Sequence, residues 1–134
     1  MVGVAIFDLD HFQQVNDDHG HTTGDRILRL FVDVAETELR AGDVFARYGG
    51  EEFVALFVGA KRENIIVVAE RARSAVAEAS IEVDGKELST TVSVGISFFA
   101  GEESELAPVL QRADRALYEA KKDRRNRYVV AVHA

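Results

Sequence analysis

The spacing of hydrophobic and polar residues changes its period several times along the chain, and each period predicts a different element. Residues 2–7 (Val-Gly-Val-Ala-Ile-Phe) form an almost continuous apolar run, which is typical of a central strand buried on both faces. Residues 90–99 alternate between large apolar side chains and Thr, Ser or Gly, which is the period of a strand. Residues 128–132 predict a final, shorter strand.

Apolar residues at helical spacing predict four helices, over residues 11–20, 21–39, 62–79 and from 106 to the lysines at 121 and 122. We expect Gly20 to close the first helix as its C-cap. Thr22 and Asp25 have the spacing of an N-terminal capping box for the second helix. Pro108 is acceptable only because it falls in or near the first turn of the last helix.

Two stretches have the pattern of β-hairpins. Residues 44–47 and 53–58 flank Gly49 and Gly50, which can take backbone dihedrals forbidden to other residues. Residues 81–83 and 86–89 flank an Asp-Gly turn. Helices alternating with mostly hairpin-linked strands predict one α+β domain over residues 1–134, with helices packed on its sheet.

Composition narrows the class of protein. The 134 residues are 47% hydrophobic, which is enough for one compact domain with a core. No apolar run approaches the length that spans a membrane, and the N-terminus lacks the pattern of a signal peptide. The absence of cysteine excludes disulfides and thiolate zinc sites. A net charge of −7 argues against a general nucleic-acid binder.

Three polar features could carry chemistry. Asp8 and Asp10 follow the first strand and point to the same side of it, and Glu51 and Glu52 stand at a hairpin tip. Residues 121–127 contain five cations in seven residues of an otherwise acidic chain. Carboxylates at one sheet edge suit Mg²⁺, and the cations suit phosphate. These features predict a magnesium-dependent nucleotide enzyme, with a hydrated strand end and a solvated turn as the simpler readings of the acids.

Two further polar residues, Asn16 and Asp25, lie off the apolar stripes at the ends of the first two helices. Local capping is the simplest role for either residue alone.

Residues 47–53, Arg-Tyr-Gly-Gly-Glu-Glu-Phe, resemble the signature of the GGDEF family of diguanylate cyclases in its GGEEF form. The resemblance extends over most of the chain, through residues 7–12, 15–17, 20–25, 92–97, 112–118 and 120–121. It implies a palm-like fold akin to adenylyl cyclases, and an enzyme that condenses two GTP into cyclic di-GMP with release of two pyrophosphates. It also implies that two such domains face each other, so that a homodimer is needed for catalysis.

Site roles follow from the resemblance, position by position. Asp8 and Glu51 become ligands of Mg²⁺, with Mn²⁺ as an alternative, and the carbonyl of Leu9 completes the protein's share. Glu51 also accepts the proton of the 3′-hydroxyl, and Glu52 is a further metal ligand or supports one. The residues implied to bind GTP are Asn16 and Asp25 at the guanine, His21 at the nucleotide, and Lys121 and Arg125 at the triphosphate. No role follows for Asp10, His11, His19 or His133.

The resemblance implies an inhibitory site as well. Arg40 and Asp43 form an Arg-x-x-Asp at the spacing at which the family binds its product, cyclic di-GMP. Arg71 or Arg73, on the next helix, is expected to add a contact.

Two departures bear on activity. Many members have Lys at the position of Gln13, where a cation is thought to stabilise phosphate charge, so turnover is expected to be reduced. Arg124 stands where the family has a glycine. The family's usual leader and any sensor or dimerisation domain are absent, so we expect a cytoplasmic fragment of a larger signalling protein, free or tethered to a membrane sensor. The alternatives are a non-catalytic module that binds GTP or cyclic di-GMP, and a cyclase acting on ATP.

Overall fold

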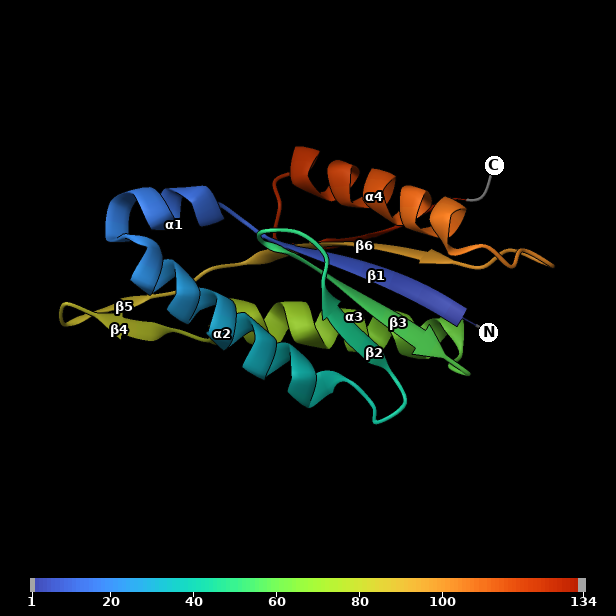
Figure 1. Ribbon diagram of the computed structural model, residues 1–134, viewed down its shortest axis with the longest axis horizontal. Coiled ribbons are helices and arrows are strands. Elements are labelled where there is room, and N and C mark those ends of the chain that lie inside the picture. The colour runs from blue at the N-terminus through green and yellow to red at the C-terminus, as the bar shows by residue number, and fades with distance from the viewer. Residues whose placement is uncertain (1, 133–134) are drawn as a thin grey trace.

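The computed structural model describes residues 2–132, which build one five-stranded sheet in the order β2-β3-β1-β6-β7 (Figure 1). The central strand β1 is antiparallel to both of its neighbours, and only β7 runs parallel to the strand beside it. The predicted α+β class with a mostly antiparallel sheet is therefore confirmed. The strands are β1 (Val2–Leu9), β2 (Val44–Arg47), β3 (Glu52–Val58), β6 (Val92–Phe98) and β7 (Tyr128–Val130).

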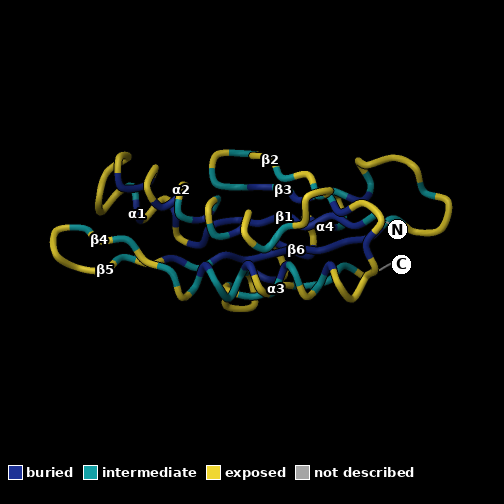
Figure 2. Tube along the Cα trace, turned by 90° about the horizontal axis from the view of Figure 1, so that it is seen from below, coloured by how far each residue is buried: buried dark blue, intermediate teal, exposed yellow. Residues whose placement is uncertain are grey.

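Helices cover both faces of this sheet. Their bounds are α1 (Phe12–His19), α2 (His21–Glu38), α3 (Arg62–Glu78) and α4 (Leu106–Lys122). The helices α2 and α3 lie on one face and α4 lies on the other (Figure 1). Strands β1 and β6 are consequently buried throughout most of their length, as the dark blue trace in Figure 2 shows. Among residues 2–132, none of the helices combines the length and the apolar composition that a bilayer crossing demands.

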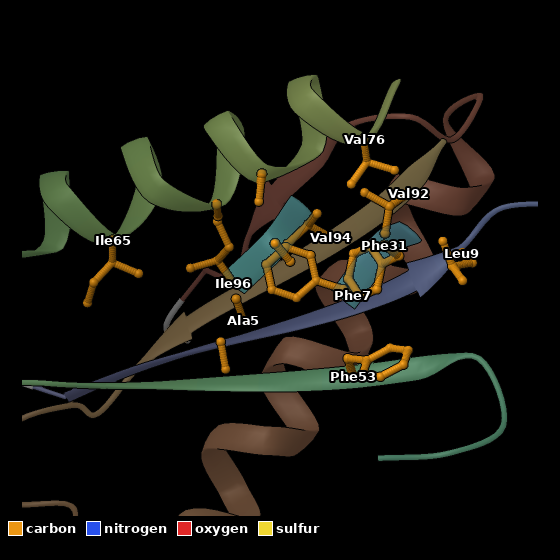
Figure 3. Packing of buried hydrophobic residues seen from close by; sticks show 14 of the residues in the cluster. Ala5, Phe7, Leu9, Phe31, Phe53, Ile65, Val76, Val92, Val94 and Ile96 are labelled. Atoms are coloured by element: carbon orange, nitrogen blue, oxygen red, sulfur yellow. The ribbon is translucent and has the colours of Figure 1, made fainter. Parts of the chain in front are cut away.

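Side chains of β1 alternate between two apolar clusters. Ala5, Phe7 and Leu9 belong to the larger cluster with α2 and α3 (Figure 3). Val4 and Ile6 belong to the smaller cluster under α4. Burial of a side chain of this size stabilises the fold by about 1.5–3 kcal/mol, as an upper estimate. The prediction of a strand buried on both faces is confirmed.

The polar side of β6 is also buried, although alternation of this kind usually marks a strand with one face in water. Ser97 Oγ donates a 2.6 Å hydrogen bond to the carbonyl of Val109 on α4. A Cβ atom on Gly95 would overlap the backbone of Ala113 and Leu117. Small and hydroxyl side chains at these positions therefore allow α4 to approach the sheet closely.

The junction of α1 and α2 is tighter than the sequence suggests. Gly20 caps α1 as predicted, with φ of 88° and its N–H donating to the carbonyl of Asn16 at 2.8 Å. The capping box predicted for Thr22 and Asp25 is wrong, because α2 already begins at His21 and no side chain caps it. Gly20 turns the chain within a single residue, which moves the start of α2 ahead of Thr22.

Both predicted hairpins are present. Strands β2 and β3 pair in register around the turn at residues 48–51. The second hairpin is a separate ribbon of β4 (Ile81–Val83) and β5 (Lys86–Leu88). Its turn residues Asp84 and Gly85 have φ of 50° and 80°, as a type I′ turn requires.

Candidate active site

The end of β1 and the start of β3 bring the predicted carboxylates together. Asp8 is the register partner of Glu52, and the N–H of Leu9 donates to the carbonyl of Glu51 at 3.2 Å. Asp8 projects from the α4 side of the sheet, since it follows Val4 and Ile6 at alternate positions of the strand. Sheet pairing therefore places Asp8, Glu51 and Glu52 at one edge.

The two oxygens of Asp8 have different surroundings. Oδ2 forms a 2.7 Å ion pair with Lys121 Nζ at the end of α4, whereas Oδ1 is buried and has no partner. Burial raises the pKa of Asp8, and the charge of Asp10 adds to this, while Lys121 and Arg125 oppose it. A buried carboxylate oxygen without a partner is costly, so a cation at Oδ1 would relieve the site.

The two glutamates at the hairpin tip add to the negative charge. Burial raises the pKa of Glu51, and the Asp8 carboxylate raises it further. The pKa of Glu52 is raised in the same way, with Asp114 of α4 as an additional negative neighbour. Lys121 opposes both shifts. This edge therefore holds more negative charge than its own cations offset.

The backbone of the hairpin tip is held by Arg47. Its Nε donates to the carbonyl of Gly49 at 3.1 Å, and Nη2 donates to the carbonyl of Gly50. Contrary to expectation, neither glycine has a positive φ. A Cβ atom at Gly50 would meet nothing within 4 Å. At Gly49 the nearest atom to such a Cβ would be Oε1 of Glu52, at 3.4 Å, so neither a positive φ nor a clash within the chain requires these glycines.

A hard divalent cation fits the donor set at this edge. Carboxylate oxygens are the ligands that Mg²⁺ prefers, and Asp8 Oδ1 is available. Within residues 2–132, no three acidic or histidine side chains converge closely enough to hold an ion by themselves. That arrangement suits Mg²⁺, which usually takes one or two protein carboxylates and completes its shell with water and substrate phosphates.

Asn16 and Asp25, the predicted guanine-binding residues, lie on adjoining helices. Asn16 Oδ1 is buried without a partner, so its side chain makes no capping bond. A Cβ atom on Gly24 of α2 would overlap this oxygen, so the missing side chain makes room for the amide. Asp25 is exposed and lines a groove of about 650 Å³ together with Arg47 and Phe53 of the hairpin.

Of the other predicted contacts, Gln13 and His21 are exposed. Gln13 Nε2 donates to Asp17 Oδ1 at 3.0 Å, one turn along α1. His11 and His19 line a separate cavity of about 300 Å³ between α1 and residues 88–91. His133 lies outside the described residues.

The role of Asp10 was not apparent from the sequence. It is buried, and Thr91 Oγ1 and Ser93 Oγ each donate to its carboxylate at 2.6 Å. The backbone N–H of Asn126 donates to it at 3.0 Å. Hydroxyl residues at alternate positions of the neighbouring strand were the only sequence signal for these contacts.

The predicted phosphate-binding patch is smaller than the run of cations indicates. Lys121 pairs with Asp8, and Arg125 is near enough to affect the pKa of Asp8. Arg127, in contrast, pairs with Asp123 at 2.7 Å and donates to the carbonyl of Arg125. Lys121 and Arg125 are therefore the cations that face the acidic edge.

The predicted inhibitory residues lie at the other end of β3. Arg40 Nη2 pairs with Asp43 Oδ1 at 3.2 Å and donates to the carbonyl of Val58 at 3.4 Å. Strand β3 separates this point from Glu52 by about 20 Å, at ~3.4 Å per residue. Arg40 and Arg71 line one cavity of about 310 Å³, whereas Arg73 is bound elsewhere.

Comparison with known proteins agrees with this geometry. The family model described as "Diguanylate cyclase, GGDEF domain" matches residues 1–127. The chain is 43% identical over 128 residues to diguanylate cyclase DgcP of Pseudomonas aeruginosa, covering 96% of this chain and 19% of the relative. It is 36% identical over 130 residues to diguanylate cyclase A of Treponema denticola, covering 97% of this chain and 35% of the relative.

A solved structure resembles the whole fold. The GGDEF domain of DgcB from Caulobacter crescentus, determined in complex with c-di-GMP, superposes with a TM-score of 0.91 at 31% identity. The match covers 96% of this chain and 77% of that structure. The expected family and its fold are therefore confirmed, although the chain spans only about a fifth to a third of the length of the curated relatives it matches. The chain belongs to the GGDEF domain family.

Proposed function

We propose that this domain is a diguanylate cyclase, which condenses two GTP into cyclic di-GMP. In each half-reaction the 3′-oxygen of one GTP bonds to the α-phosphorus of the other, and the bond from that phosphorus to pyrophosphate breaks. The observation that carries the proposal is the meeting of Asp8, Glu51 and Lys121 at one sheet edge, with Asp8 Oδ1 buried and unpartnered. Family membership supports the same chemistry.

Asp8, the carbonyl of Leu9 and Glu51 would hold Mg²⁺ or Mn²⁺, with Glu52 as a further ligand or support. A bound divalent cation neutralises phosphate charge and polarises the phosphoryl oxygens. Glu51 accepts the proton of the 3′-hydroxyl, and its raised pKa brings it closer to the range in which a carboxylate is an effective base. Lys121 and Arg125 bind the triphosphate.

Guanine recognition falls to Asn16 and Asp25, whose amide and carboxylate match the donors and acceptors of the guanine edge. Support comes from the unpartnered Asn16 oxygen and from the groove lined by Asp25. His21 would contact the nucleotide. Gln13 supplies a neutral donor where a cation would stabilise the phosphates better, so we expect modest turnover.

The reaction requires two domains, because each GTP is held by one domain and attacked from the other. The decisive experiment fuses the chain to a dimeric coiled coil, adds GTP and Mg²⁺, and analyses the products by chromatography. We expect cyclic di-GMP and pyrophosphate from the parent and none from Glu51→Ala. A matched control, Glu87→Ala on the exposed β4–β5 ribbon, keeps the parent's rate. Equal product from Glu51→Ala and the parent would refute the proposal.

We also propose that cyclic di-GMP inhibits the enzyme at Arg40 and Asp43, with Arg71 adding a contact from α3. The shared cavity of Arg40 and Arg71 supports this. Calorimetric titration with cyclic di-GMP is expected to give saturable binding that Arg40→Ala abolishes. Such binding without any turnover of GTP would instead favour the alternative function, a non-catalytic receptor. Gln13, which stands where many family members have a lysine, favours that alternative.

A further inference from the structure

The loop that follows α4 has an unusual backbone. Arg124, Arg125 and Asn126 have φ of 76°, 60° and 47°, three consecutive left-handed residues without a glycine. A left-handed arginine costs about 1–2 kcal/mol, whereas asparagine tolerates this conformation better. The loop persists because other groups hold it, and it carries Arg125 beside the acidic edge.

One of these groups is Asp10. Its Oδ2 accepts both the N–H of Asn126 at 3.0 Å and the hydroxyl of Thr91 at 2.6 Å, while Oδ1 accepts the hydroxyl of Ser93 at 2.6 Å. Thr90 Oγ1 also donates to the backbone carbonyl of Asp10, at 3.1 Å. Asp10 is only 2% exposed. The carboxylate thus fastens the left-handed loop to the ends of β1 and β6.

A second group reaches the loop from α3. Arg73 Nη1 donates to the side-chain oxygen of Asn126 at 2.7 Å, and its Nε is held by Glu70. Asn126 is therefore hydrogen-bonded to Asp10 through its backbone N–H and to Arg73 through its side chain. Because Arg125 directly precedes Asn126 in the chain, these contacts also restrict the position of Arg125.

We propose that Asp10 and Arg73 are positioning residues for triphosphate binding, which act by holding Asn126 so that Arg125 faces the substrate phosphates. Neither residue needs to touch the substrate. This inference rests on the proposed function, and it predicts a defect in binding phosphates rather than guanine.

The surroundings of Asp10 set it apart from a metal ligand. Both of its oxygens are already bound by protein donors, whereas Asp8, two residues earlier and within β1, has one oxygen without a partner. A cation at Asp10 would have to displace a hydroxyl or the Asn126 N–H. Asn can replace Asp10 in this network, since its oxygen can serve Asn126 and Thr91 while its amide donates to Ser93.

The test is calorimetric titration of the chain, with Mg²⁺ present, against three probes: a non-hydrolysable GTP analogue, inorganic triphosphate and GMP. The variants are Asp10→Ala, Asp10→Asn, Arg73→Gln and the control Arg115→Gln. Arg115 is exposed on α4 and makes no hydrogen bond or ion pair among the described residues, so its variant matches the charge lost at Arg73.

We expect Asp10→Ala to weaken triphosphate and GTP-analogue binding about tenfold, and Arg73→Gln about threefold, because only part of the free energy of the lost hydrogen bonds is passed on to phosphate binding. Asp10→Asn and Arg115→Gln should stay within about twofold of the parent, as should GMP binding by every variant. A merely structural role of Asp10 would weaken all three probes equally.

The outcomes are separable. If Asp10→Ala does not fold, as judged by circular dichroism, Arg73→Gln decides, since it leaves the core intact. Equal affinities of Arg73→Gln and Arg115→Gln for triphosphate would overturn the inference. Triphosphate binding that depends on Asp10 without any preference for guanine would support the inference while contradicting the cyclase proposal. A parent that binds neither triphosphate nor the GTP analogue would overturn both.

Discussion

Asp8 and Asp10, at the end of β1 and just beyond it, differ in how completely their polar groups are bonded. On the hairpin side, Asp8 keeps a buried oxygen without a partner, and the pKa values of Glu51 and Glu52 are raised. On the side of β6 and the loop after α4, Asp10 is bound by two hydroxyls and a backbone N–H. The same residue type, at the end of β1 in Asp8 and just beyond it in Asp10, therefore has incomplete bonding in one case and complete bonding in the other.

This difference distinguishes groups that would bind a ligand from groups that hold the protein's own structure in place. A fold without its ligands cannot satisfy groups that the ligands will satisfy, so incomplete bonding accumulates where they bind. Among the described residues, three buried side-chain atoms lack partners, and two of them, in Asp8 and Asn16, belong to the proposed substrate site. The third is Nε of Arg112, whose other nitrogens bind Glu103 and the carbonyl of Phe98.

The largest effect is expected from a substitution of Asp8, whose polar atoms are incompletely bonded. Asp8→Asn removes a metal ligand and should lower cyclase activity at least about 1,000-fold, in line with loss of a metal's charge stabilisation. Because burial raises the pKa of Asp8, the folded state favours a neutral side chain at this position, and this variant should gain stability in the absence of metal. Activity assays and denaturant unfolding measure the two effects. A loss of stability would mean that Asp8, like Asp10, stabilises the fold through its own contacts.

A second variant tests the other incomplete group. Gly24→Ala forces Asn16 to move its amide, so affinity for GTP should fall about tenfold and selectivity over ATP should shrink. Stability should change little, since Ala favours a helix over Gly by about 1 kcal/mol, which offsets the local shift. Titration with GTP and ATP measures the effect. Adding Asn16→Ala to Gly24→Ala should cause little further loss, whereas additive losses would show that the two residues act separately.

The loop after α4, which Asp10 holds in place, can be tested through the strain in its left-handed backbone. Arg124→Gly should stabilise the domain by about 0.5–1 kcal/mol, because glycine adopts a φ of 76° without a steric penalty but adds freedom to the unfolded chain. Arg124→Ala removes the same charge without relieving the backbone, and is not expected to stabilise. Thermal unfolding separates the two variants. Equal stability would mean that Arg124 is not strained.

The smallest effect concerns pH. Since the pKa values of Asp8, Glu51 and Glu52 are raised in the folded state, their protonated forms favour folding below the ordinary carboxyl pKa of about 4. That contribution is lost as pH rises through the raised values. Mg²⁺ binding requires the ionised forms, so its stabilising effect should grow over the same window, to a Tm increase of about 4 °C near neutrality. A Tm increase independent of pH would locate the metal elsewhere.

Much of the fold was predictable from the sequence, because β1, α3, α4 and the two hairpins have clear periods and turn residues. The burial of the polar face of β6 against α4 was not predictable, because alternation of Val and Ser looks the same whether the polar face meets water or a helix. The start of α2 was misplaced, because Thr22 and Asp25 have capping spacing while Gly20 alone turns the chain.

The positions of some candidate site residues relative to one another were predictable from the strand and hairpin pattern. Pairing of β1 with β3 agrees with the expected meeting of Asp8 and Glu52. The contacts of Asp10, Gly24 and Arg73 were not predictable, because each joins residues far apart in sequence or depends on an atom that is missing. Single residue types carry no signal for such contacts.

The absence of a side chain at Gly95, in the middle of the sheet, affects the site at the end of β1. Any side chain there would press on the backbone of α4 at Ala113 and Leu117. The helix is rigid, so it would tilt or lift as a unit, and its far end carries Lys121, which meets Asp8 at 2.7 Å. The absence of a side chain at Gly95 therefore sets the distance between the sheet and α4. That distance in turn determines whether Lys121, one helical turn beyond Leu117, can reach Asp8.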